Sequence, residues 1–237
     1  MQDPDIYFRQ LLAGRQVAVQ HPVAGQMRNF MYLIGDPKSR KALVVDPAWD
    51  VTSLLDTAKR DGYEIVGALI SHYHPDHVGG DLWGVEVEGV SALLEEVSVP
   101  LYVNKNEAEG VKVVTGVSDS DLKRVDDASS LDLGDLQIQF LHTPGHTPGS
   151  QCFLIGNRLV AGDTLFVQGC GRVDLPGGDP DQMYYSLTQK LAKLPAETVL
   201  FPGHDYGPTE TSTIGTELDN NVYLRVGSLE DWRRLMG

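Results

Sequence analysis

Cysteine is scarce in this sequence, which has 237 residues but only two cysteines, Cys152 and Cys170. Two cysteines far apart in the chain do not form the disulfide framework of small secreted domains, and they cannot supply a cysteine-type structural zinc site. We expect both to pack as small buried hydrophobic side chains in a reduced, cytoplasmic protein.

Targeting signals and long apolar segments are also missing. The sequence has no run of about 18 apolar residues that could cross a bilayer. Its first residues, MQDPDIYFRQ, do not place a basic segment before an apolar one, so they do not resemble a secretory signal. We therefore expect no membrane partner.

Positive charge is in deficit, with 19 lysines and arginines against 33 aspartates and glutamates and a net charge of −14. A polyanion would on average be repelled, so we expect no nucleic-acid partner. The nearest basic cluster, DPKSRK at residues 36–41, is typical of a polar hairpin turn.

The apolar segments predict a layered α+β protein that forms one domain over residues 1–237. Helices are expected from Val51 after an N-cap at Asp50, over 183–194 after an N-cap at Asp179, and over 229–236. Residues 107–130 look polar and irregular. Strands are expected at QVAVQ (16–20), NFMYLIGD (29–36), KALVVD (41–46), EIVGALIS (64–71), VPLYVN (99–104), LQIQFLHT (136–143), SQCFLIG (150–156), RLVAGD (158–163) and TVLFPGHD (198–205).

Four of these strands lead into histidine or aspartate residues, and the stretch SHYHPDHVGG (71–80) alone carries three histidines. Loops that follow neighbouring strands meet at one edge of a sheet, so these side chains should converge. Imidazole and carboxylate ligands suit zinc, iron or manganese, and seven ligands suit two ions that share a carboxylate. His21 and His142 are left out as structural histidines. The candidate metal ligands are His72, His74, Asp76, His77, His146, Asp163 and His204.

The motifs HYHPDH, PGHTPGS, GDTLF and PGHD, in this order, resemble those of the metallo-β-lactamase superfamily. NFMYLIG and ALVVDP are similar to the opening strands of that family. The resemblance implies a four-layer αββα sandwich of two mixed β-sheets, with helices outside. It implies one metal held by His72, His74 and His146, and a second held by Asp76, His77 and His204. Asp163 would bridge the two metals, and Asp46 would hydrogen-bond to a metal ligand without contacting the metal itself.

The segments LFVQGCGRVD and PGHDYG resemble the glyoxalase II and persulfide dioxygenase branch, whose members act on glutathione thiol derivatives. Antibiotic hydrolysis is disfavoured because true β-lactamases usually carry cysteine or serine where Asp163 stands. The nucleic-acid-processing branch is disfavoured by the charge. We expect a metallo-hydrolase of the hydroxyacylglutathione hydrolase type, a thioesterase in which two divalent ions, zinc by expectation, share a hydroxide. Asp76 and Asp163 would orient this nucleophile.

The alternative is a persulfide dioxygenase that holds one Fe(II) on His72, His146 and Asp163. GCGRVD and the short tail after His204 favour it, whereas HYHPDHVGG resembles the hydrolases. A third alternative is a non-hydrolytic di-iron module like that of flavodiiron proteins, which would need a redox partner chain.

The expected partner is a small-molecule substrate derived from a thiol. Arg172 could anchor it, because a guanidinium matches a carboxylate, and Tyr206 could line its pocket. A structural ion pair and a packed loop tyrosine are the competing interpretations. For assembly, an isologous homodimer is the default expectation.

Overall fold

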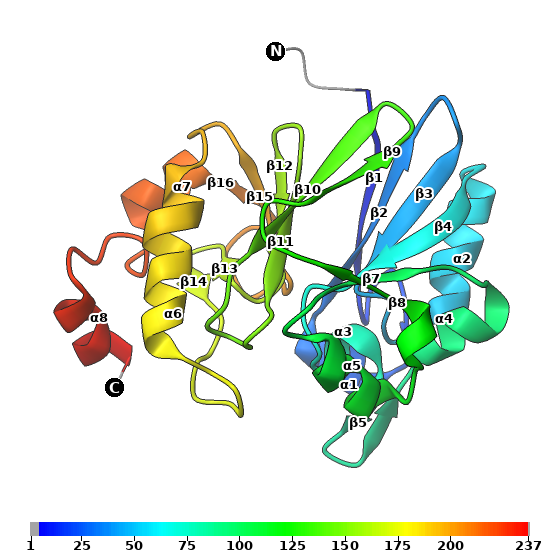
Figure 1. Cartoon of the computed structure of the whole chain (residues 1–237), viewed down its shortest axis with the longest axis horizontal. Coiled ribbons are helices and arrows are strands. Elements are labelled where there is room, and N and C mark those ends of the chain that lie inside the picture. The colour runs from blue at the N-terminus through cyan, green and yellow to red at the C-terminus, as the bar shows by residue number, and fades with distance from the viewer. Residues whose placement is uncertain (1–4, 237) are drawn as a thin grey trace.

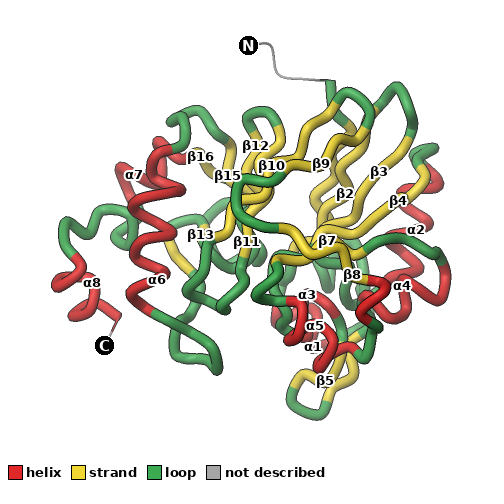
Figure 2. Tube along the Cα trace, viewed as in Figure 1, coloured by secondary structure: helices red, strands yellow, loops and turns green. Residues whose placement is uncertain are grey.

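Two β-sheets lie face to face between outer helices in the computed structural model, which describes residues 5–236 (Figure 1). Figure 2 shows the strands in the middle of the molecule and the helices on its two outer sides. This arrangement confirms the predicted four-layer αββα sandwich.

The first sheet has six strands in the order β1-β2-β3-β4-β7-β8. The strands β1, β2 and β3 pair antiparallel, whereas β3, β4, β7 and β8 run parallel, so the sheet is mixed. Their bounds are Tyr7–Leu12, Phe30–Asp36, Lys41–Val45, Glu64–Leu69, Leu101–Asn104 and Leu122–Val125.

The second sheet also has six strands, in the order β16-β15-β12-β11-β10-β9. It is antiparallel except for the parallel pair β12 and β15. The bounds from β9 to β12 are Ser130–Leu133, Leu136–His142, Gln151–Ile155 and Arg158–Val160, and β15 and β16 span Val199–Phe201 and Ser212–Thr213. Two small hairpins lie outside the sheets, β5–β6 (Gly80–Leu82, Val85–Val87) and β13–β14 (Leu165–Phe166, Gly169–Cys170).

The helices divide between the two outer layers. On the side of the first sheet lie α1 (Pro22–Met27), α2 (Val51–Arg60), α3 (Pro75–Val78), α4 (Val90–Glu96) and α5 (Ala108–Thr115). On the side of the second sheet lie α6 (Pro180–Tyr185), α7 (Ile214–Asn220) and α8 (Leu229–Met236). In the described part of the chain no helix is both long and apolar enough to span a membrane.

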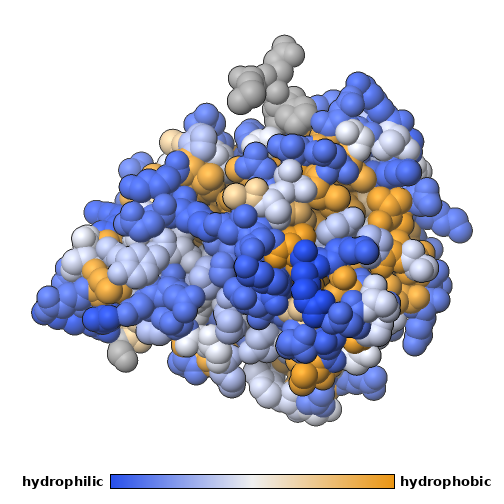
Figure 3. All heavy atoms as spheres, in the orientation of Figure 1, coloured by the Kyte–Doolittle hydropathy of each residue, from blue (hydrophilic) through white to orange (hydrophobic). Residues whose placement is uncertain are grey.

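Three apolar clusters hold the layers together. One fills the space between the sheets, where Tyr32 and Val45 of the first sheet pack with Phe140 and Phe153 of the second. The other two lie between each sheet and its outer helices. In Figure 3, hydrophilic residues cover most of the visible face, and hydrophobic residues gather mainly around β4 and β7.

The sequence predictions held for most of the central elements. Asp50 caps α2 by accepting a hydrogen bond from Ser53, and Asp179 caps α6 in the same way. The predicted strand at residues 16–20 is wrong, since the first strand is β1 and these residues form turns. The expectation of an irregular segment at 107–130 is also wrong, because it contains α5 and β8.

The C-terminal helix α8 depends on one side chain. Trp232 is fully buried, its ring lies 5.9 Å from that of Tyr184, and its indole N–H donates to the carbonyl of Pro180 at 2.7 Å. Replacing it by alanine would leave a large cavity and remove this hydrogen bond between α8 and α6.

We predict that Trp232→Ala lowers the free energy of unfolding by about 3–5 kcal/mol, as typical large-to-small core changes do. Leu235→Ala, on the exposed side of the same helix, should change it by less than about 0.5 kcal/mol. Urea unfolding of the metal-loaded proteins measures both. Equal effects of the two variants would show that α8 is not part of the cooperative core.

Candidate metal centre

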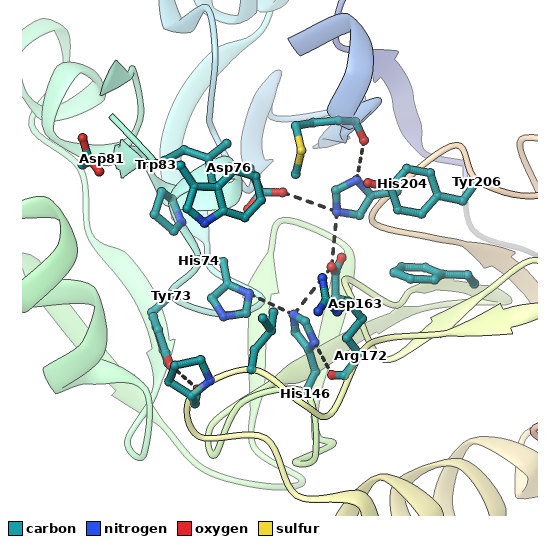
Figure 4. Close-up of a pocket in the computed structure, with 16 residues that line it drawn as sticks. Tyr73, His74, Asp76, Asp81, Trp83, His146, Asp163, Arg172, His204 and Tyr206 are labelled. Carbon is teal, nitrogen blue, oxygen red and sulfur yellow. Dashed lines mark hydrogen bonds and ion pairs between the residues drawn. The ribbon is translucent and has the colours of Figure 1, made fainter. Parts of the chain in front are cut away.

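Five of the predicted ligands line a pocket of about 400 Å³ at one edge of the sandwich (Figure 4): His74, Asp76, His146, Asp163 and His204. His72 and His77 do not line it but lie against His74 and His204. His72 and His74 follow β4, and His146 follows β10. Asp163 follows β12, and His204 follows β15. These side chains meet because the loops that follow the buried strands all leave the sheets at the same end.

His72, His74 and His146 form one ligand group. The Nδ1 atom of His74 lies 3.1 Å from Nε2 of His72 and 2.9 Å from Nε2 of His146. All three rings thus direct a nitrogen at one point, and these nitrogens lie within 4.8 Å of one another. Three convergent imidazoles are a typical ligand set for a divalent transition metal.

Asp76, His77 and His204 form the second group. Oδ2 of Asp76 lies 3.5 Å from Nε2 of His77 and 3.4 Å from Nε2 of His204, and the two Nε2 atoms are 3.2 Å apart. Asp76 and His77 lie in the single turn of α3, and Pro75 begins that turn. Because of this turn, Asp76 and His77 point to a different place from His72 and His74. One loop therefore contributes residues to both groups.

Asp163 lies between the two groups. Its Oδ2 is 3.6 Å from Nε2 of His146 and 3.2 Å from Nε2 of His204, and its Oδ1 is 3.3 Å from Nε2 of His77. Oδ1 is buried without a hydrogen-bond partner. A Cβ atom on residue 203 would lie 2.2 Å from Oδ1, so glycine at that position leaves room for the carboxylate.

The outer nitrogens of four rings are occupied by hydrogen-bond acceptors. Nδ1 of His72 lies 2.9 Å from the Ser71 hydroxyl, and that of His77 lies 3.0 Å from Oδ2 of Asp46. Nδ1 of His146 and of His204 donates at 2.7 Å to the carbonyls of Arg172 and Met27. Each of these four acceptors favours the neutral tautomer that carries its proton on Nδ1, and in that tautomer the Nε2 lone pair is directed at the centre.

Burial and neighbouring charges set the protonation of the two groups differently. Burial lowers the pKa of His72 and His146, and it lowers that of His74 to about 4, with His146 adding repulsion. Burial is the largest influence on His77 and His204 and opposes their protonation, but the carboxylates of Asp163 and Asp76 together outweigh it and raise both pKa values.

The pKa of Asp163 shows the reverse balance. Burial raises it, but His204 and His77 outweigh burial and hold it well below the ordinary range. The carboxylate is therefore ionised. Five directed imidazoles and two buried carboxylates, one with an unpartnered oxygen, fit two divalent cations that share Asp163.

Asn29 and Trp49 support the second group and were not identified from the sequence. The Asn29 amide donates to Oδ2 of Asp76 at 2.9 Å, and the Trp49 indole N–H donates to the amide oxygen of Asn29 at 3.0 Å. Asn29 stands directly before β2. The only signal in the sequence is a polar residue directly before an apolar strand, and its burial appears only in the structure.

Glu107 was also missed, and it joins the loops that carry the first group. Its buried carboxylate accepts from the backbone N–H of Tyr73 at 2.8 Å and of Gly149 at 2.6 Å, and from the Thr147 hydroxyl at 2.7 Å. Burial raises its pKa to about 7, although these three donors pull it down. Tyr73 follows His72, and Thr147 follows His146, so Glu107 fixes both loops at once.

The remaining predicted residues lie in or near the pocket. Arg172 and Tyr206 both line it, and the Tyr206 ring stacks on that of His204 with centroids 4.5 Å apart. The Arg172 guanidinium pairs with Asp174 at 2.8 Å, and its backbone carbonyl, not its side chain, contacts a ligand. The guanidinium would have to leave Asp174 to bind a substrate, so the anchoring role of Arg172 stays a prediction.

The other histidines and the cysteines lie outside the two groups. His21 caps α1 by accepting from the N–H of Ala24, and His142 contacts the carbonyl of Pro148. Both cysteines are free thiols, and burial raises the pKa of Cys152 to about 11 and that of Cys170 to about 12. Neither thiol is a nucleophile at neutral pH.

Comparison with known proteins identifies relatives over most of the chain. The probable polyketide biosynthesis zinc-dependent hydrolase PksB of Bacillus subtilis (strain 168) is 27% identical over 213 residues, covering 89% of each chain. The hydroxyacylglutathione hydrolase of Nitrosococcus oceani is 33% identical over 202 residues, covering 83% of this chain and 70% of the relative.

The crystal structure of ETHE1 from Myxococcus xanthus is similar with a TM-score of 0.78 and 30% identity, covering 97% of this chain and 89% of that one. The family model of the metallo-beta-lactamase superfamily matches residues 24–204, from α1 to the last of the histidine ligands. The chain belongs to the metallo-β-lactamase superfamily.

Proposed function

We propose that this protein is a binuclear metal-dependent hydrolase that cleaves a thioester of a small thiol, as a hydroxyacylglutathione hydrolase does. The observation that carries the proposal is that both ligand groups are complete and that Asp163 lies between them. Two zinc ions are the proposed cofactors, because neutral imidazole and carboxylate ligands suit zinc.

Two bound divalent ions would lower the pKa of a water molecule and polarise the thioester carbonyl. The protein's own contribution is to position the reactants. The ionised carboxylates of Asp76 and Asp163 can accept hydrogen bonds from the attacking water and orient its lone pair. The thiolate of a thioester is a good leaving group, so a cysteine nucleophile is not required.

Two of the relatives support hydrolysis. PksB is named as a zinc-dependent hydrolase and the Nitrosococcus oceani protein as a hydroxyacylglutathione hydrolase. The half-buried Cys170 also argues for direct attack by water, since desolvation raises its thiol pKa to about 12.

The second candidate is a persulfide dioxygenase with one iron on His72, His146 and Asp163. The similarity to the ETHE1 structure, with a TM-score of 0.78, favours it, because the human relative ETHE1, 30% identical over 218 residues, is named as a persulfide dioxygenase. In that case Asp76, His77 and His204 would form a buried polar cluster without an ion. The outward hydrogen bonds of His77 and His204, which prepare each Nε2 for a metal, argue for the binuclear hydrolase.

Metal content separates the two candidates. We predict two zinc ions per chain in protein purified without added metal, and loss of thioester hydrolysis after chelation with recovery when zinc returns. Elemental analysis and a thioester assay measure this. One iron per chain, together with oxygen consumption on glutathione persulfide, would contradict the hydrolase proposal and support the dioxygenase.

Removing a ligand tests the site itself. We predict that His146→Ala lowers kcat by at least about 100-fold and reduces the metal content, because the first ligand group loses one of three nitrogens. The control is His142→Gln, at the end of the strand that precedes His146, which lies outside the ligand groups and keeps a hydrogen-bonding side chain. Unchanged metal content and activity in His146→Ala would remove the basis for the site.

Glu107 gives a prediction that depends on pH. The Glu107→Gln amide would place an N–H group against the backbone donors, so kcat should fall by about 10–100-fold, as for other residues that orient ligands. Glu109→Gln, two residues along and exposed, should change neither activity nor stability.

The sign of the pH effect follows from the raised pKa. The pKa of Glu107 is about 7 in the folded state, against 4.5 for the ordinary group. Between these two pH values the folded state therefore binds one more proton than the unfolded state. The stability of the wild type relative to Glu107→Gln should therefore fall as pH rises from about 5 to about 8, by at most about 3 kcal/mol. Denaturant unfolding at several pH values measures it, and a difference independent of pH would refute the assignment.

A further inference from the structure

The hairpin β5–β6 presents a tryptophan at its tip, beside the metal ligands. Trp83 has φ 55° and Gly84 φ 86°, which is the left-handed backbone of a two-residue hairpin turn that favours asparagine or glycine. The Trp83 side chain is 80% exposed, whereas Trp49 and Trp232 are 5% and 0% exposed. An asparagine would stabilise this turn better than a large, solvent-exposed aromatic residue, so Trp83 is not explained by folding.

The hairpin base is fixed relative to the ligands. It begins three residues after His77, and Gly80 packs so closely on α5 that a Cβ atom there would lie 2.6 Å from the carbonyl of Val114. Figure 4 shows Trp83 on one side of the pocket and Tyr206 on the other, with His74, His146, Asp163 and His204 between them. The hairpin base is therefore fixed beside the ligands, and the exposed Trp83 at the tip forms part of the pocket lining.

The rest of the pocket wall is largely apolar. Beyond the metal ligands, the lining includes Met27, Leu82, Phe166, Leu175 and Pro176. Together with Trp83 they surround the ligands with hydrocarbon and aromatic surface. Such a wall lowers the free energy of an apolar group that leaves water, and it offers little to a charged one.

Free positive charge is lacking at the same place. Among the described residues that line the pocket, Arg172 is the only arginine or lysine, and its guanidinium makes two hydrogen bonds to Asp174, at 2.9 and 2.8 Å. Arg28, which precedes the buried Asn29, pairs with Asp205. Asp81 adds a carboxylate to the lining. The two carboxylates of a glutathione moiety would have to compete with Asp174 or Asp205 for either guanidinium.

We propose that Trp83 is a specificity-determining residue, and that the pocket takes a thioester with an uncharged hydrophobic group beside the reacting bond in preference to a glutathione thioester. The group lies against the Trp83 indole and the apolar wall. This inference rests on the proposed thioester hydrolysis for its reaction, but its binding step does not depend on turnover.

The first test compares hydrolysis of four thioesters: the benzoyl and acetyl esters of N-acetylcysteamine, the acetyl ester of benzyl mercaptan, and S-acetylglutathione. We expect at least one benzyl or benzoyl ester to exceed S-acetylglutathione at least tenfold in kcat/KM. The position of the ring in the better ester tells whether the acyl or the thiol part faces Trp83. The substitution Trp83→Asn suits the turn and should leave the metal content unchanged. It should raise KM for the aromatic thioester, so that the kcat/KM ratio of this ester to S-acetylglutathione falls to about one.

Two variants control for the substitution. Trp83→Phe keeps an aromatic ring at the tip and should retain most of the preference. Tyr185→Ala removes an exposed aromatic ring that does not line the pocket, and should leave the ratio unchanged. A ratio that survives in Trp83→Asn would overturn the role of Trp83, and a preference for S-acetylglutathione in the wild type would overturn the substrate class.

The second test needs no turnover. The other two tryptophans are buried, so added ligands should perturb mainly the fluorescence of Trp83. S-benzyl-N-acetylcysteamine, a thioether that cannot be hydrolysed, should change the emission with saturation, and S-methylglutathione should not at equal concentration. Trp83→Asn should abolish the change.

The two tests separate the inference from the proposed function. If no thioester is hydrolysed while the thioether still saturates the Trp83 signal, the hydrolase proposal fails and the hydrophobic pocket stands. If thioesters are hydrolysed but the thioether gives no Trp83-dependent signal and no hydrophobic preference, the inference fails and the hydrolase stands.

Discussion

The carboxylate of Asp46 is the point on which both ligand groups depend. It accepts hydrogen bonds from the Ser71 N–H at 2.7 Å, from the Ser71 hydroxyl at 2.6 Å and from Nδ1 of His77 at 3.0 Å. Because the Ser71 hydroxyl in turn accepts from His72, one buried carboxylate orients a ligand in each group. Asp46 adopts φ 49°, an unfavourable backbone that the surrounding contacts must hold in place.

The ligands could be predicted from the sequence because the signal is local. Each follows an apolar strand, and the ends of such strands meet wherever the sheets assemble. Asn29 and Glu107 could not, since each acts on residues 34 to 48 positions away along the chain. The failures in the fold have a similar origin. Residues 16–20 alternate like a strand but find no partner strand, while α5 and β8 gain their stability from packing on the first sheet rather than from strong local patterns.

Substrate recognition was the least accessible to sequence reasoning. Arg172 was expected to anchor the substrate because arginine binds carboxylates, and only the structure reveals that its exposed guanidinium pairs with Asp174. Trp83 carries no motif at all. Its significance comes from exposure, backbone strain and proximity to the ligands taken together, and none of these can be read from a composition or a spacing.

The same seven residues can serve a binuclear or a mononuclear centre, and the protonation of His77 and His204 is the physical variable that separates the two. Asp163 raises the pKa of both rings. With no cation in the second group they would take up protons and balance the buried carboxylates of Asp76 and Asp163. With a cation bound they must be neutral, and the ion provides that balance instead. Charge neutrality of the buried pair of carboxylates can thus be reached by protons or by metal, and the fold, with Met27 and Asp46 accepting the outer N–H groups, is prepared for metal.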